Sequence, residues 1–217
     1  MISSRFAKLM VETGSAYVMP LIIRPLIADD TSAYRALRHR ILCSEEAAYF
    51  SDSFERERQL DDSQWREWCK EKLEHCILGA FDTEAALVGV MMIRRQGDGD
   101  SPIVVWEALW LDPQHRRGRL CKSIFGRAEQ WTKEQGYSFA AAFIRETNIR
   151  QTINPTINIC HKLGFVDAYT VQDDLWADGS VANVRALLRD LRPNASEFDG
   201  MPVFERFKEA LPYLVGR

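Results

Sequence analysis

The sequence predicts a mixed α/β fold of the α+β kind. A central mixed, mostly antiparallel sheet is flanked by helices on both faces and followed by a C-terminal helical extension. Two observations favour this class. Between residues 76 and 111, three strand-like runs are separated by short turn clusters, as in an antiparallel meander. On either side of them, apolar residues recur at three- and four-residue spacing, as on helices that bury one face.

Composition limits the classes of function. The chain has 217 residues, 46% of them hydrophobic, which is enough to bury a core. Its 28 Lys and Arg residues face 31 Asp and Glu residues, so no overall field attracts nucleic acid or anionic lipid. No apolar run approaches the roughly 20 residues that cross a bilayer, and residues 1–20 lack a signal-peptide core. We therefore expect a soluble, cytoplasmic protein with no nucleic-acid or membrane partner.

Metal sites are not expected either. The five cysteines are an odd number and include no Cys-x-x-Cys pair, which is typical of reduced thiols. The four histidines show no metal-ligand spacing.

The first half of the chain starts with residues 1–20, which show no clear period and receive no function. Residues 21–26 are apolar and β-branched and predict a strand. Asp29 and Asp30 then supply N-cap chemistry for an amphipathic helix. A second helix is expected after the capping run at residues 61–63. Its apolar face is Trp65, Cys69 and Leu73.

Strands and helices alternate from residue 76 onward. The meander strands are expected over 76–81, 87–94 and 103–111, followed by a helix over about 119–135. A short apolar strand buried on both faces is expected over 139–144. The last two elements of this part are a short helix over 155–163, which Gly164 stops, and a strand over 165–176.

The C-terminal part is expected to be helical over 181–191 and again over about 201–215. We accordingly divide the chain into a lead segment (1–20), a core domain (21–178) and a C-terminal helical extension (179–217). The apolar residues of the second helical stretch are expected to pack on the chain's own sheet by default. Packing in a homodimer or on a partner helix stays open.

The most informative stretch runs from Trp110 to Lys122, where a strand enters a basic turn and then a helix. The first turn of a helix presents unpaired N–H groups and the positive end of the helix dipole, which together bind phosphate or pyrophosphate. The basic residues of this turn could instead be solvated surface cations. They are Arg116, Arg117, Arg119 and Lys122.

In this stretch Leu111, Pro113 and Arg116 follow the pattern V-x-P-x-x-R-G-x-G-x-G/A, and the chain here resembles the GCN5-related N-acetyltransferase (GNAT) family. Lys-Leu-Gly-Phe at 162–165 is similar to a later motif of that family, and residues 23–25, 34–38 and 48–57 are similar to its opening. The resemblance covers about residues 21–176. The order of the predicted elements matches the family fold independently.

The resemblance implies that acetyl-CoA is the co-substrate and that no metal takes part. The backbone near the end of the 103–111 strand would bond the pantetheine, and an N–H of Leu111 or Trp110 would meet the oxyanion. The pyrophosphate would lie on residues 116–122, namely Arg116, Arg117, Gly118, Arg119, Leu120, Cys121 and Lys122.

Two departures from the family pattern bear on cofactor affinity. The loop glycines of the pattern fall on Arg119 and Cys121, and Gly118 is one place early. A left-handed conformation at either position would cost on the order of 1–2 kcal/mol. Charge-assisted hydrogen bonds from the extra arginines would offset part of that cost.

Three further residues are site candidates, each with a structural alternative. Glu107 lies where some relatives carry a Glu that reaches the acceptor amine, or it is simply an outward sheet residue. Cys160 lies where many relatives have a Tyr that protonates the departing thiolate, or it is a small core residue. Asn154 could bond the pantetheine amides, or cap the following helix. The acidic residues Asp52, Glu55 and Glu57 would suit a cationic acceptor, although Arg56 and Arg58 alternate with them.

The sequence thus predicts an acyl-CoA-dependent N-acyltransferase that transfers acetyl to a primary amine by direct attack. The acceptor is a small-molecule or peptide amine whose identity the sequence does not give. The alternative is a catalytically degenerate module that binds coenzyme A or a protein partner without turnover.

Overall fold

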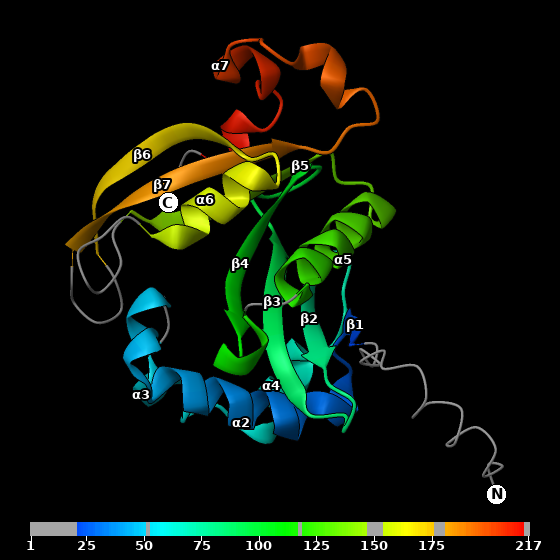
Figure 1. The fold of residues 1–217 in the computed structure, drawn as a ribbon, viewed down its shortest axis with the longest axis vertical. Helices are drawn as coiled ribbons and strands as arrows, with labels where there is room; N and C mark the ends of the chain where they lie inside the picture. The colour runs from blue at the N-terminus through cyan, green and yellow to red at the C-terminus, as the bar shows by residue number, and fades with distance from the viewer. Residues whose placement is uncertain (1–20, 51–52, 117–118, 147–153, 176–180, 215–217) are drawn as a thin grey trace, which may run out of the picture.

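A computed structural model of the chain describes residues 21–50, 53–116, 119–146, 154–175 and 181–214. Its centre is one seven-stranded sheet in the order β1-β2-β3-β4-β5-β7-β6 (Figure 1). All neighbouring strands are antiparallel except β4 and β5, which are parallel. The strands are β1 (Ile22–Pro25), β2 (His75–Phe81), β3 (Leu87–Arg95), β4 (Ile103–Leu111), β5 (Phe139–Arg145), β6 (Val166–Leu175) and β7 (Val181–Asp190).

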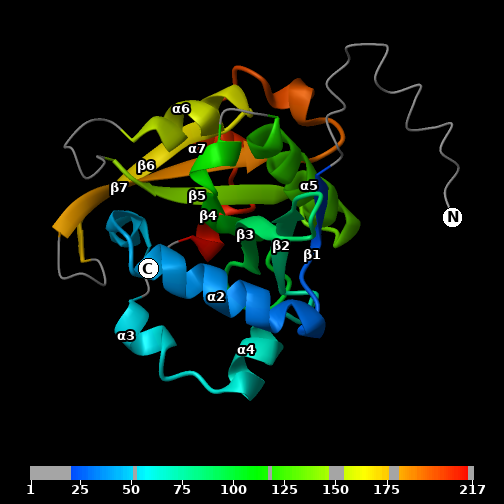
Figure 2. The same cartoon turned by 60° about the horizontal axis from the view of Figure 1, so that its bottom comes forward.

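Helices cover both faces of the sheet, as the sequence predicts (Figure 2). One face carries α5 (Leu120–Glu134) and α6 (Pro155–Lys162), and we call it the α5 face. The opposite face carries α2 (Thr31–Leu42) and α4 (Asp62–Trp68), with α3 (Phe54–Glu57) nearby, and we call it the α2 face. No helix in the described part of the chain is both long and apolar enough to cross a membrane.

The two faces take alternate residues of β4. Val104 and Trp106 pack with α5, while Ile103 and Val105 pack on the opposite face. Near the end of the strand, Ala108 and Leu109 together lie opposite one residue of β3, Met91. This is a β-bulge. Ala108 has a φ of +52°, a left-handed conformation that an L-residue adopts at a cost in strain.

β4 also loses one of its two neighbours along its length. It pairs with β5 only over Ile103–Val105, while β5 continues alongside β7 as far as Arg145. Beyond Val105, β4 and β5 diverge (Figure 1). The last six residues of β4, 106–111, are therefore paired on the β3 side alone, and we call them the splayed segment.

Most predicted elements and stops are confirmed, including the capping of α4 by Asp61, whose carboxylate accepts from two first-turn amides. Two details are wrong. The Asp30 carboxylate accepts from Arg24 and from the Ile27 N–H instead of capping α2. Leu73 is 61% exposed, because α4 ends at Trp68 and no longer carries it on an apolar face.

The helix predicted over 181–191 is also wrong, because Val181–Asp190 forms β7. Apolar residues at 181, 184, 187, 188 and 191 have helical spacing, but the strand lies between β5 and β6 and is buried on both faces. Leu187 packs on the α5 face and Leu188 on the other. The edge of β5 offers backbone hydrogen bonds to a neighbouring strand, and this pairing outweighs the helical spacing of the apolar residues.

Residues 191–214, which we call the C-terminal cap, cover the α2 face over β4, β5 and β7. Beyond β7 they form short helical turns, of which α7 (Val203–Arg206) is one, and lie at one end of the molecule (Figure 1). Phe207, Ala210 and Leu214 pack against the sheet. The default expectation of packing on the chain's own sheet is confirmed.

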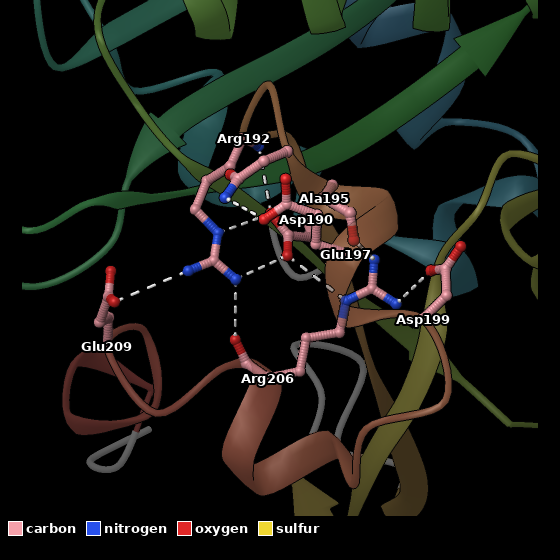
Figure 3. Close-up of polar contacts among 8 residues, drawn as sticks. Asp190, Arg192, Ala195, Glu197, Asp199, Arg206 and Glu209 are labelled. Atoms are coloured by element: carbon pink, nitrogen blue, oxygen red, sulfur yellow. Dashed lines mark hydrogen bonds and ion pairs between the residues drawn. The ribbon is translucent and has the colours of Figure 1, made fainter.

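An ion cluster holds the cap at its base. The fully buried carboxylate of Asp190 lies between the guanidinium groups of Arg192 (2.8 Å) and Arg206 (3.4 Å), as Figure 3 shows. Arg192 also donates to the carbonyl oxygen of Arg206, and Arg206 pairs with Asp199. These bonds tie the end of β7 to the helical turns of the cap.

Candidate active site

The splayed segment presents backbone groups on the side that β5 leaves. The Asp112 N–H donates to the Val88 carbonyl oxygen at 2.8 Å, so residue 112 faces β3. Because hydrogen-bonded pairs recur every second residue in an antiparallel ladder, Trp110 faces β3 as well, whereas the N–H and C=O of Leu111 point away from it. Of the two predicted oxyanion donors, this geometry favours Leu111.

The start of α5 lies on the α5 face of the sheet. Arg119 is its N-cap residue, has helical backbone angles and makes no side-chain capping bond. Leu120 is buried in the core, Cys121 is half-buried against it, and the side chains of Arg119 and Lys122 are exposed. Since the N–H groups of a first helical turn have no intrahelical partners, they are available to an anion here. Arg117 and Gly118 lie outside the described residues.

Arg116 points elsewhere. Its two terminal nitrogens donate to the two carboxylate oxygens of Glu46, at 2.6 and 2.7 Å, and its Nε donates to the Leu111 carbonyl oxygen at 2.8 Å. All three nitrogens of the guanidinium are therefore committed within the chain. The expectation that Arg116 offers its side chain to a pyrophosphate has no geometric support in this arrangement.

Glu46 was not a sequence candidate. It belongs to a 3-10 turn, Glu45–Tyr49, that follows α2 on the α2 face. Besides Arg116, it accepts a hydrogen bond of 2.7 Å from the indole Nε1 of Trp110. The hydrogen bonds from Arg116, and then that from Trp110, hold the pKa of Glu46 below its usual range despite the opposing effect of burial. A lone Glu in a polar turn carries no sequence signal of such contacts.

Glu107 lies on the opposite face of the sheet from the start of α5. Its neighbour across the ladder is Met92, which packs with α2-face residues, so the Glu107 side chain shares that face. Arg94 donates to it through Nε at 3.0 Å. His75 is paired with Arg94 in the next ladder, and burial is the main cause that lowers its pKa, so its imidazole is neutral at pH 7. The structure thus gives Glu107 cationic and titratable neighbours.

The other two candidates have structural roles in this geometry. Cys160 is 1% exposed in the core, and burial, together with the nearby Cys121, raises its pKa to about 12. Proton transfer from such a thiol to a thiolate with an ordinary pKa of about 8.5 is uphill. Asn154 caps α6, because its Oδ1 accepts from the Thr156 N–H at 3.0 Å, and its own N–H is bonded to Glu146. Both observations favour the structural alternatives.

Of the three acidic residues expected to attract a cationic acceptor, Asp52 lies outside the described residues, and the other two are paired with arginines. Glu57 is 1% exposed and forms a buried ion pair with Arg38 of α2. Glu55 pairs with Arg58 on the surface. Neither offers a carboxylate to a ligand in this arrangement. Among the described residues, no group of three or more His, Cys, Asp or Glu is placed to hold a metal ion.

The parts of the site lie on two sides of one sheet. The α5 N-terminus is on one face, Glu107 is on the other, and the unpaired edge of the splayed segment connects them. A ligand with an anionic end and a reactive end could lie along this edge, with its anion on α5. A second substrate could then approach from the α2 face.

Comparisons with known proteins bear on the family and the fold of the chain. The sequence model of the acetyltransferase (GNAT) family matches residues 39–165. No curated protein sequence matches the chain.

Solved structures show the same fold at low identity. The acetyltransferase yncA of Salmonella typhimurium, described as putative and solved with acetyl-CoA, is 16% identical with a TM-score of 0.64, and the match covers 80% of this chain and 95% of that one. A GNAT-family acetyltransferase of Streptococcus pneumoniae is 15% identical with a TM-score of 0.64, covering 79% and 99%. The paiA N-acetyltransferase of Thermoplasma acidophilum, solved with coenzyme A, is 17% identical with a TM-score of 0.55, covering 79% and 99%.

Proposed function

Because the chain belongs to the acetyltransferase (GNAT) family, we propose that it is an N-acyltransferase that transfers acetyl from acetyl-CoA to a primary amine by direct attack. The observation that carries this proposal is the splayed segment of β4, which presents the Leu111 N–H along an edge beside the α5 N-terminus. We expect the reaction to take place in the cytoplasm, on a small-molecule or peptide amine.

The described residues fit acetyl-CoA at both ends. The first-turn amides of α5, with the exposed side chains of Arg119 and Lys122, would take the diphosphate. The Leu111 backbone would bond along the edge that β5 leaves. Acetyl-CoA supplies an activated acetyl group as a thioester, and the Leu111 N–H would stabilise the negative charge that develops on its oxygen.

On the α2 face, Glu107 would receive the amine in place of the hydrogen bond that it accepts from Arg94. An alkyl ammonium with a pKa of about 10.4 is about 3.4 units from losing its proton at pH 7, a cost near 4.6 kcal/mol. A carboxylate can hold the ammonium and take that proton, directly or through a water. Glu107 takes the first proton from the ammonium and passes it to solvent. The amine nitrogen then bonds to the acetyl carbon, the carbon–sulfur bond breaks, the thiolate leaves with its electron pair, and the second nitrogen proton passes to that thiolate or to water.

Calorimetry with acetyl-CoA, followed by mass-spectrometric screening of acetyl transfer onto an amine library, tests the proposal. Binding at micromolar to millimolar ligand, with at least one acetylated amine, supports it. No binding at millimolar acetyl-CoA overturns the enzyme proposal.

The second candidate is a module that binds coenzyme A without turnover. It is favoured by Arg119 and Cys121 at the glycine positions of the family pattern and by the burial of Cys160. A thermal shift with coenzyme A, but no product from any amine in the library, supports the module. Any turnover rules it out.

A further inference from the structure

Four hydrogen bonds link one carboxylate and one guanidinium to each other and to the end of β4. Glu46 accepts from the indole of Trp110 and from both terminal nitrogens of Arg116, while the Arg116 Nε donates to the carbonyl oxygen of Leu111. The guanidinium of Arg116 also lies 5.8 Å from the centre of the Trp110 ring. We call these four residues, 46, 110, 111 and 116, the β4 clamp.

The clamp contacts the side chain of Trp110, which precedes Leu111, and the carbonyl oxygen of Leu111 itself. Leu111 stands at a position of the β3 ladder where residues exchange no hydrogen bonds, and β5 does not pair with it. The two peptide planes that carry these groups are anchored to β3 on their other side, through Trp110 and through the Asp112 N–H, and the clamp adds contacts that hold the end of the strand from the side away from β3. The Trp110 indole is fixed by Glu46, and the Leu111 carbonyl is fixed by Arg116.

We propose that Glu46 is a positioning residue for the transfer reaction, which acts through Arg116 and Trp110 to fix the Leu111 N–H at the thioester oxygen. This inference rests on the proposed function. The physical reason is that a donor stabilises developing charge only when it is already oriented, because reorientation during the reaction consumes the gain. Arg116 accordingly orients the end of β4 and does not bind the diphosphate.

A second ion pair of the same build provides a matched control. Arg24 donates two bonds to Asp30, of 2.6 and 2.9 Å, and the Asp30 carboxylate also accepts from the Ile27 N–H. Both carboxylates thus take a two-pronged guanidinium and one further N–H. The Asp30 pair, however, lies at β1, with β2 and β3 between it and β4.

The experiment compares Glu46→Gln, Arg116→Lys, their double variant and Asp30→Asn by turnover rate, by the Kd of acetyl-CoA from calorimetry, and by Tm. We expect Glu46→Gln and Arg116→Lys each to lower kcat about 10- to 100-fold, since a misplaced donor costs that much. The double variant should lose about as much as either single variant, because the two residues act as one unit. The Kd should stay within about twofold, and Asp30→Asn should keep the parental kcat.

Several outcomes overturn the inference. A parental kcat in Glu46→Gln, losses that multiply in the double variant, or an equal loss of turnover in Asp30→Asn would each do so. If the Kd of acetyl-CoA rises with Arg116→Lys but not with Glu46→Gln, Arg116 binds the diphosphate and does not position Leu111.

Hydrogen exchange keeps the inference testable if the parent protein has no turnover, which would be a failure of the proposed function alone. Peptides that span residues 106–112 should exchange faster in Glu46→Gln than in the parent or in Asp30→Asn. Equal exchange in all three would show that the clamp does not orient this segment.

Discussion

The two parts of β4, which we call the doubly paired half (103–105) and the splayed half (106–111), have different neighbours. Ile103–Val105 pairs with β3 on one side and β5 on the other, and all three residues are fully buried. The splayed segment pairs with β3 alone, contains a bulge with a positive φ at Ala108, and carries Glu107. The first half is therefore core, and the second half is where the proposed chemistry lies.

The difference shows how a site can arise inside an apolar strand. Backbone N–H and C=O groups need partners wherever water is excluded, and a strand that loses its neighbour must find them elsewhere. In the splayed segment, the backbone groups on the side that β5 leaves can bond to side chains such as Arg116 or to a ligand. A change in the doubly paired half should alter stability, and a change in the splayed half should mainly alter activity.

The largest expected effect tests the doubly paired half. Ile103→Ala empties a site that is 0% exposed and should lower the free energy of unfolding by about 2–5 kcal/mol. Leu109→Ala, at a partly buried residue of the splayed segment, should lower it by less. Urea denaturation of both variants measures this. Equal losses would contradict the division of β4 into a core half and a site half.

Glu107→Gln tests the splayed half. The amide cannot take the proton of the acceptor amine, so kcat/KM at pH 7 should fall about 100-fold with little change in Tm. Rates across pH 6–9 measure the loss. Because raising the pH deprotonates the free amine, the loss should shrink at higher pH. A parental rate across this range would remove Glu107 from the reaction.

Asp190→Asn tests the ion cluster beside the doubly paired half. Burial raises the pKa of Asp190, but hydrogen bonds from Arg192 and Arg206 outweigh it and leave that pKa below the ordinary value. The ion cluster therefore stabilises the folded state above about pH 4 and loses this contribution as the pH falls through the lowered pKa.

The Asn variant should consequently be less stable by about 2 kcal/mol at pH 7, since it leaves charged guanidinium groups without their carboxylate. Its deficit relative to the parent should shrink below pH 4. Urea denaturation at pH 7 and pH 3 checks both values. A deficit that does not change with pH would mean that the carboxylate charge is not the cause.

Cys160→Ala separates packing from proton donation. We expect a loss of about 1 kcal/mol in stability, because a buried sulfur is removed, and a turnover rate within about twofold of the parent. Denaturation and steady-state rates measure the two. A turnover rate that falls by about 100-fold or more would make the thiol a proton donor despite its burial.

The smallest expected effect concerns the strained bulge. Ala108 (φ +52°) and Ala85 (φ +61°), in the β2–β3 loop, have the same unfavourable conformation. Glycine relieves it but loses chain entropy, so each Ala→Gly variant should gain about 0.5 kcal/mol in stability. Only Ala108→Gly should lower kcat, because only that residue belongs to the splayed segment. If both variants change turnover equally, the conformation of the bulge does not contribute to activity.

Much of the fold could be predicted because its signals are local. The apolar stripe of α5, the capping run before α4 and the turn residues between the meander strands each depend on residues a few positions apart. The strand β7 could not be predicted, because its apolar residues fit a helix equally well and the free edge of β5 decided between them.

The site could be predicted in outline only. The strand–turn–helix pattern indicated the α5 N-terminus, and the position of Glu107 on β4 was readable. The hydrogen-bond partner of Arg116 could not be predicted, because Glu46 and Arg116 are 70 residues apart in the sequence. The ion pair that buries Glu57 likewise joins residues 19 positions apart, beyond the reach of any helical or strand period.

By itself, the sequence determined most of the elements, their order and the family pattern at the turn into α5, since periodicity and capping act within a few residues. Only the tertiary structure decided which side chains are committed within the chain, where β4 leaves β5, and that Leu111 faces the edge so opened. These features depend on contacts between segments far apart in the chain, and hydrogen bonds of that kind leave no periodic trace in a sequence.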